Sequence, residues 1–155
     1  MNEIRVRRLV VAGFATLLIF IALGILLEGI IGHVVFGDAL EAQWQQKFGP
    51  QEWTGVNYLV ALLKAVFQST LVIWLYASLR PMYGVGAKTV LITSGVLVTL
   101  VLSIVVGGIN SGMLPAQASL VAVMYEAIEV PLALLVGASV YEGREEWDRE
   151  DDELV

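Results

Sequence analysis

The stretch MYEAIEVPLALLVGASVY, residues 124–141, is apolar enough to cross a lipid bilayer. It also holds two carboxylates, Glu126 and Glu129, and a proline, Pro131, two residues after the second acid. A spanning helix needs about 20 mainly apolar residues, and the segment 116–141 is long enough. The sequence therefore predicts a transmembrane helix that carries two acids, and the role of these acids is the central question.

Three further segments have the same apolar character, at about residues 9–36, 56–79 and 88–108. Hydrophobic residues make up 57% of the chain and charged residues only 15%, whereas soluble domains carry about a quarter charged residues. We therefore expect an all-α fold, a polytopic membrane protein with four transmembrane helices that form a single domain over residues 1–155.

The basic residues predict the orientation, because cytoplasmic loops carry an excess of Lys and Arg. They gather before the first span, between the second and third spans, and after the fourth: Arg5, Arg7, Arg8, Arg80, Lys88, Arg144 and Arg149. The first extramembrane loop has only Lys47, and the last loop has no basic residue. Both termini are thus predicted to be cytoplasmic, with residues 142–155 as an acidic tail.

The first extramembrane loop is predicted to form a short helix. Asp38 and Glu41 have the spacing of a capping box, and Gly49-Pro50 is a stop signal. Apolar residues recur between them at every fourth position: Leu40, Trp44 and Phe48. We expect an interfacial helix on the outer membrane surface, as a lid over the bundle or as a docking surface.

Four ionisable side chains lie within the predicted spans: Glu28, Lys64, Glu126 and Glu129. At a rise of about 1.5 Å per residue, the first three fall roughly 12–15 Å below the outer boundary, and Glu129 lies one turn deeper. Each charge at the bilayer centre costs about 2.5–3.5 kcal/mol. We therefore expect the four to face one another inside the bundle, supported by three polar residues: Asn57, Gln68 and Ser119.

The charges of this cluster do not balance, because three carboxylates face one ammonium group. A protonated carboxyl, a bound cation or a positive group from a partner would remove the surplus. Alternatively the cluster is structural: Glu28 pairs with Lys64, and the other two acids bond to polar neighbours and fix the helix register. Both interpretations stay open at this point.

His33 lies near the outer end of the first span, about 140° around an α-helix from Glu28. We expect an interfacial histidine, with a role as a pigment or metal ligand as the alternative. The chain has no cysteine and a single histidine, and metal sites need several converging donors. No metal site is therefore predicted, and the identity of any cofactor stays unknown.

The segment after the second span, YASLRPMYGVGAKT (76–89), contains Arg80-Pro81 followed by Gly84 and Gly86, which favours a tight turn. Together with YEAIEVPLALLVGASVY (125–141), it resembles a loose group of uncharacterised small bacterial four-helix integral membrane proteins. These have an Arg-Pro turn after the second span and a Glu-x-Pro in the last. The resemblance implies the bacterial inner (plasma) membrane and implies no activity.

The sequence leaves three functions to compare. The first is a non-catalytic accessory subunit or assembly factor, which binds a protein partner through the acidic tail or the interfacial helix. The second is an oligomeric proton- or cation-coupled transporter or channel that uses Glu28, Glu126 and Glu129. The third, an intramembrane enzyme, has no Ser/His/Asp pattern to support it. We predict the first, with no enzymatic activity and no nucleic-acid partner, and keep the second as the alternative; a homo-oligomer is compatible with both.

Overall fold

The computed structural model describes residues 6–50 and 54–143. Its elements, all helical, are α1 (Val6–Gly24), the π-helix η1 (Ile25–Gly32), α2 (His33–Phe36), α3 (Ala39–Phe48), α4 (Gly55–Tyr83), α5 (Ala87–Asn110) and α6 (Ala116–Glu142). α1, η1 and α2 together form one apolar segment. With α4, α5 and α6, this gives four segments long and apolar enough to cross a membrane, as the sequence predicts.

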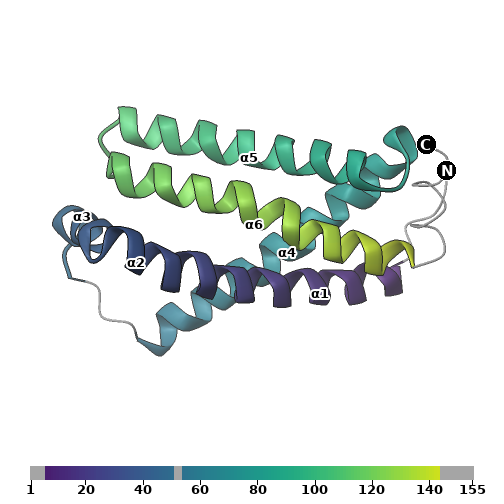
Figure 1. Cartoon of the computed structure of the whole chain (residues 1–155), viewed down its shortest axis with the longest axis horizontal. Coiled ribbons are helices and arrows are strands. Elements are labelled where there is room, and N and C mark those ends of the chain that lie inside the picture. Colours follow the sequence, from purple (N-terminus) through teal and green to yellow (C-terminus); the bar gives the residue numbers. More distant parts are fainter. Residues whose placement is uncertain (1–5, 51–53, 144–155) are drawn as a thin grey trace.

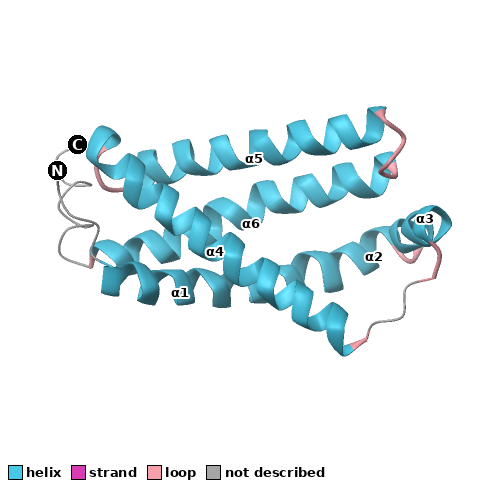
Figure 2. Ribbon diagram, turned by 180° about the vertical axis from the view of Figure 1, so that it is seen from behind, coloured by secondary structure: helices cyan, strands magenta, loops and turns pink. Residues whose placement is uncertain are grey.

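The helices form a bundle that is tight at one end and open at the other (Figure 1). α6 packs between α1 and α5, and α4 crosses behind them and contacts both α1 and α5. Figure 2 shows that the Tyr83 end of α4 lies close to α5, whereas its Gly55 end diverges from α5 and α6. We call the end that holds Val6 and Glu142 the terminal end, and the opposite end, which carries α3, the α3 end.

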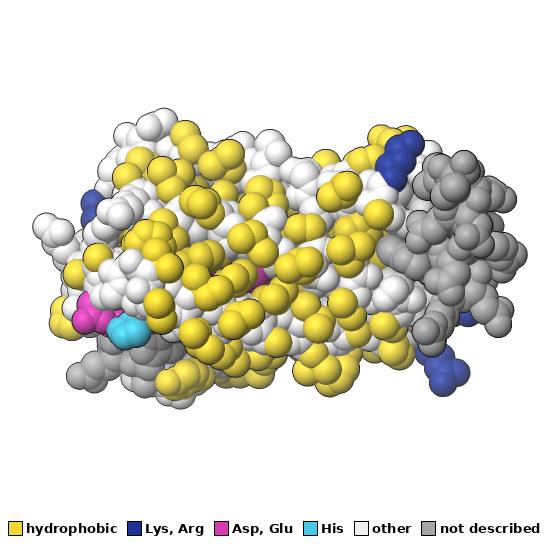
Figure 3. All heavy atoms as spheres, viewed as in Figure 1, with side chains coloured by type: hydrophobic (Ala, Val, Ile, Leu, Met, Phe, Trp, Pro, Cys, Tyr) yellow, Lys and Arg dark blue, Asp and Glu magenta, His cyan; other side chains and the backbone are white. Residues whose placement is uncertain are grey.

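The buried core lies mainly in the half of the bundle nearer the terminal end. It is built around Tyr76 and includes Ala12, Phe20, Val72, Ile73, Ala77, Val90, Val130, Ala133, Leu134, Ala138 and Tyr141. Large apolar side chains elsewhere on the long helices are exposed, and Figure 3 shows them over much of the visible face. Such a surface is what a bundle surrounded by lipid presents, since lipid tails are as apolar as these side chains.

Gly137 brings α1 and α6 into direct contact. A Cβ atom added at Gly137 would lie 1.9 Å from Thr16 Oγ1 and 3.4 Å from the backbone oxygen of Ala12. Thr16 is fully buried and donates a hydrogen bond of 2.8 Å to that same Ala12 oxygen. Small residues of this kind let helix backbones approach closely in membranes, so this contact sets the spacing of α1 and α6.

The turn predicted at Arg80-Pro81 is wrong in its position. Both residues are still in α4, which continues to Tyr83, and the turn comes after it. Gly84 (φ 89°) and Gly86 (φ 108°) supply it, because positive φ values are open to glycine at little cost. Pro81 lies in the last turn of α4, and only Met82 and Tyr83 follow it in the helix.

The capping box predicted at the start of α3 is also absent. Asp38 precedes α3, but its side chain makes no capping hydrogen bond. Its Oδ1 atom lies 3.7 Å from Nδ1 of His33 instead. Glu41 accepts a hydrogen bond of 2.8 Å from Gln45 within the helix, so it does not reach back to the helix start.

We expect Gly137→Ala to lower the free energy of unfolding by about 1–3 kcal/mol, the usual cost of overpacking a core. Thr16→Ala in the same chain should recover part of the loss, because it removes the atom nearest to the new methyl group. Gly107→Ala is the control, since a Cβ there meets no atom within 4 Å. Thermal unfolding of the detergent-solubilised protein measures all three; equal effects at both glycines would contradict the close contact.

Candidate functional site

Hydrogen bonds connect α3 to α6 and to the loop before it, at the α3 end of the bundle. The Gln43 side chain donates a hydrogen bond of 2.8 Å to Gln117 and accepts one of 3.2 Å from the backbone of Ala118. It thereby satisfies one of the free N–H groups in the first turn of α6. Lys47 donates a hydrogen bond to the Gly112 carbonyl oxygen in the loop between α5 and α6. The predicted loop helix therefore exists, and it caps the bundle.

A groove with a volume of about 770 Å³ lies between η1, α3 and α6. We call it the α3 groove. Its walls are formed by Gly24, Ile25, Glu28, Gly29, Leu40, Glu41, Trp44, Gln45, Ala118, Val121, Ala122 and Tyr125. The ring of Tyr125 lies between α6 and η1 at this end of the bundle. A Cβ on Gly32 would lie 3.1 Å from the hydroxyl of Tyr125, so the ring of Tyr125 fills the gap that Gly137 closes at the other end.

Glu28 lines this groove and belongs to a charged cluster. It is attracted by Lys64 and repelled by Glu126. Glu129, in turn, is repelled by Glu28 and Glu126 and attracted by Lys64. The structure thus brings together four ionisable residues from η1, α4 and α6 within electrostatic range. We call these four, Glu28, Lys64, Glu126 and Glu129, the charged cluster.

Direct contacts within the charged cluster are few. Gln68 donates a hydrogen bond of 2.7 Å to Oε2 of Glu126. Glu129 is only 6% exposed, and its Oε1 atom has no hydrogen-bond partner within the described residues. Lys64 is exposed and, in the part of the chain that the structure describes, forms no direct ion pair with a carboxylate. The four groups therefore interact mainly at longer range, by attraction to Lys64 and by repulsion among the acids.

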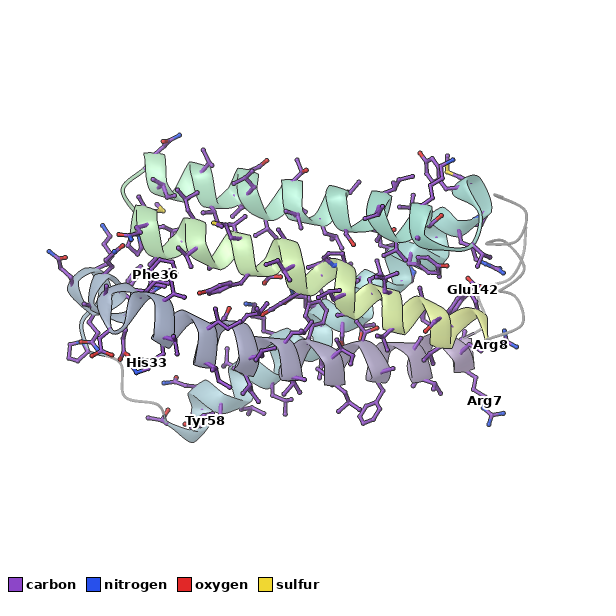
Figure 4. The ribbon with its side chains drawn as sticks, in the orientation of Figure 1. Arg7, Arg8, His33, Phe36, Tyr58 and Glu142 are labelled. Carbon is purple, nitrogen blue, oxygen red and sulfur yellow. The ribbon has the colours of Figure 1, made fainter. Side chains whose placement is uncertain are left out.

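The remaining predicted site residues lie outside the cluster. Asn57 is exposed near the Gly55 end of α4. Ser119 is buried in α6, and its hydroxyl has no hydrogen-bond partner among the described residues. His33 is 70% exposed beside Asp38 at the α3 end, where Figure 4 shows it on the outside of α2. No group of three or more metal-ligating His, Asp or Glu side chains occurs within residues 6–50 and 54–143.

The π-helical form of η1 was not predicted. Glu28 sits near its middle, and the segment ILLEGIIG is followed by the regular turn of α2. Because π-helical turns shift the direction of each later side chain, the angle of about 140° from Glu28 to His33, which assumes an α-helix, does not apply here. π-Helical segments are rare and occur frequently at functional sites. This one carries the only acidic residue of the first span.

A second polar cluster, at the terminal end, was not predicted either. Arg80 Nη2 lies 2.7 Å from Oε2 of Glu142, whose side chain is 1% exposed. Arg8 donates a hydrogen bond of 2.9 Å to the Glu142 backbone oxygen, and Figure 4 shows the two residues side by side. Tyr76 is fully buried nearby and also interacts with Glu142. These contacts tie α1, α4 and α6 together, so we call them the terminal network.

Glu142 was assigned to the acidic tail, but it is the last residue of α6. The rest of that tail, from residue 144, lies outside the described residues. The signal for the terminal network was present in the sequence. The predicted topology places Arg8, Arg80 and Glu142 at the same membrane surface, and a depth comparison like the one used for the charged cluster would have joined them.

Comparison with protein-family models, curated proteins and solved structures finds no match for this chain. The resemblance suggested by residues 76–89 and 125–141 therefore stays a prediction. The function is inferred from the geometry of the groove and of the charged cluster.

We expect Lys64→Met to lower the free energy of unfolding, because it removes the one ammonium group that attracts Glu28 and Glu129. Combining it with Glu28→Gln should recover part of the loss, with a coupling energy of about 0.5–3 kcal/mol. Lys88→Met with Glu28→Gln is the control pair, since Lys88 is an exposed residue of α5. Unfolding in detergent measures the coupling energy of each pair, Lys64 with Glu28 and Lys88 with Glu28. Equal coupling energies would show that Lys64 does not stabilise the charge of Glu28.

Proposed function

We propose that this chain is a small non-catalytic integral membrane protein, an accessory or partner-binding subunit whose charged cluster is completed by a neighbouring transmembrane helix. The observation that carries the proposal is the exposure of Lys64 on α4, eight residues or more from either end of its helix. Lipid tails offer no hydrogen bonds to such a group, and each charge at this depth costs about 2.5–3.5 kcal/mol. A protein neighbour on α4 would cover it.

The divergence of α4 supports this proposal. Its Gly55 half leaves α5 and α6 (Figure 2), so polar side chains on this half are not enclosed by the bundle. Large apolar residues around Lys64 are exposed as well, including Val60 and Leu63 at 59% each. A helix that packs here would bury apolar surface and also supply polar groups to the cluster.

The orientation belongs to the same proposal. Arg8 and Arg80 lie together at the terminal end, and cytoplasmic loops are enriched in such residues. We place the terminal end in the cytoplasm of a bacterium and the α3 end on the outer face of the inner membrane. α3 would then lie at that outer surface as an interfacial helix, and the acidic tail would be available to a cytoplasmic partner.

Photo-crosslinking in intact cells tests the partner. A photoreactive residue at Val60, one helical turn before Lys64, should give a discrete adduct after illumination. The same residue at Ile104 on α5, which is 65% exposed, is the control for random collisions in the membrane. An adduct of the mass of two chains would identify a second copy as the neighbour. Equal, diffuse labelling at both positions would reject the proposal.

A second function is favoured by a separate observation. The α3 groove extends from Glu41 and Gln45 on α3 to Glu28 in the first span, so it offers ions a route from the α3 end to one of the carboxylates. The chain would then act as a proton- or cation-coupled transporter or channel. Since the terminal network closes the opposite end, such activity would need a conformational change or an oligomer.

Purified protein in liposomes tests this second function. If it holds, an imposed proton or sodium gradient should dissipate faster than in empty liposomes, and Glu28→Gln should abolish the difference. Asp38→Asn removes the same charge from an exposed position outside the α3 groove and is the control. Wild-type liposomes that leak no faster than empty ones would exclude ion transport by the isolated chain.

A further inference from the structure

The α3 groove combines three kinds of lining. Two carboxylates, Glu28 and Glu41, lie on different elements. Two aromatic side chains, Trp44 and Tyr125, come from α3 and α6. The rest of the lining is mainly apolar and includes no Lys, Arg or His. The groove therefore carries negative charge on an otherwise apolar and aromatic surface.

The size of the groove fits a small molecule. Its volume of about 770 Å³ falls within the range of roughly 300–1,000 Å³ that is usual for small-molecule sites. A protein helix is a poor occupant, because α3 is already fastened across this end by Gln43 and Lys47. A single metal ion is poor as well, since it needs several oxygen ligands converging at short range, and the described residues hold no such group.

Two aromatic side chains give the groove part of its lining. The hydroxyl oxygen of Tyr125 is buried beside Gly32, outside the groove lining, so Tyr125 offers the groove its ring and not its hydroxyl. Trp44 is held in place by stacking on Phe48, with ring centroids 5.4 Å apart, so one aromatic wall of the groove is already ordered.

We infer that the α3 groove binds an organic cation with an apolar body, such as a quaternary or protonated amine. The positive centre would lie between Glu28 and Glu41, and the faces of Trp44 and Tyr125 would add cation–π attraction. Ile25, Leu40 and Val121 would contact the apolar part. This inference does not depend on the proposed partner, because the groove is formed by η1, α3 and α6, whereas the partner is placed on α4.

Titration calorimetry of the full chain in a neutral maltoside detergent tests the inference. The probe is benzyltrimethylammonium, and benzenesulfonate is the anion of similar size. We expect saturable binding of the cation with one site per chain and no binding of the anion. Glu28→Gln should weaken the binding of the cation by about tenfold or more, since it removes one of the two carboxylates that line the groove.

Matched variants separate the site from general charge effects. Asp38→Asn removes the same charge outside the groove, and Phe14→Leu replaces an exposed aromatic residue of α1; both should bind the cation as the unmodified chain does. Trp44→Leu and Glu41→Gln, on the peripheral helix α3, should weaken it, and they decide the result if Glu28→Gln does not fold. No saturable binding, or equal losses in Asp38→Asn and Glu28→Gln, would overturn the inference. Either outcome leaves the cross-linking test of the α4 partner unaffected.

Discussion

The close contact of α1 and α6 at Gly137 is the constraint on which the rest of the bundle depends. With no side chain between them, Thr16 and the α6 backbone touch. At the α3 end the same two segments are separated by the ring of Tyr125 beside Gly32. The spacing between these two segments is thus small at the terminal end and larger at the α3 end, as Figure 1 shows. The α3 groove lies at the wide end, between η1, α3 and α6.

The two polar clusters of the bundle differ in how well they are satisfied. In the terminal network, the Glu142 carboxylate meets Arg80 directly, and its backbone oxygen accepts from Arg8. A buried pair of this kind is weak evidence for net stability, but it fixes which groups face each other. In the charged cluster, Gln68 donates a hydrogen bond to Glu126, one of the three carboxylates, and Lys64 stays exposed. The charged groups of the first cluster are thus in direct contact, whereas the carboxylates and the ammonium group of the second form no direct ion pair among the described residues.

Hydropathy alone placed the four spans to within a few residues, because bilayer thickness imposes a length that apolar runs must meet. The predicted end of the second span was too early, since Pro81 is tolerated in the last turn of α4. The shared depth of Glu28, Lys64 and Glu126 in the membrane is inferred from residue counting and stays a prediction. Their lateral arrangement could not be inferred in this way, because the π-helical turns of η1 change the direction of side chains without any signal in the apolar pattern. The terminal network was missed because the depth comparison covered only charges inside the spans, whereas Arg8, Arg80 and Glu142 lie near the ends of their helices.

The residues that point to function lie where the bundle packs least tightly. Gly24, four residues before Glu28, has no neighbour within 4 Å of an added Cβ and lines the α3 groove. It leaves open space in the groove that Glu28 also lines. Tight packing at Gly137 supplies stability, and open packing at Gly24 keeps Glu28 accessible. If the helices had only a structural role, filling that space with side chains would increase the stability of the protein. The groove is nevertheless open beside the carboxylate of Glu28. This favours a binding role over a purely structural one.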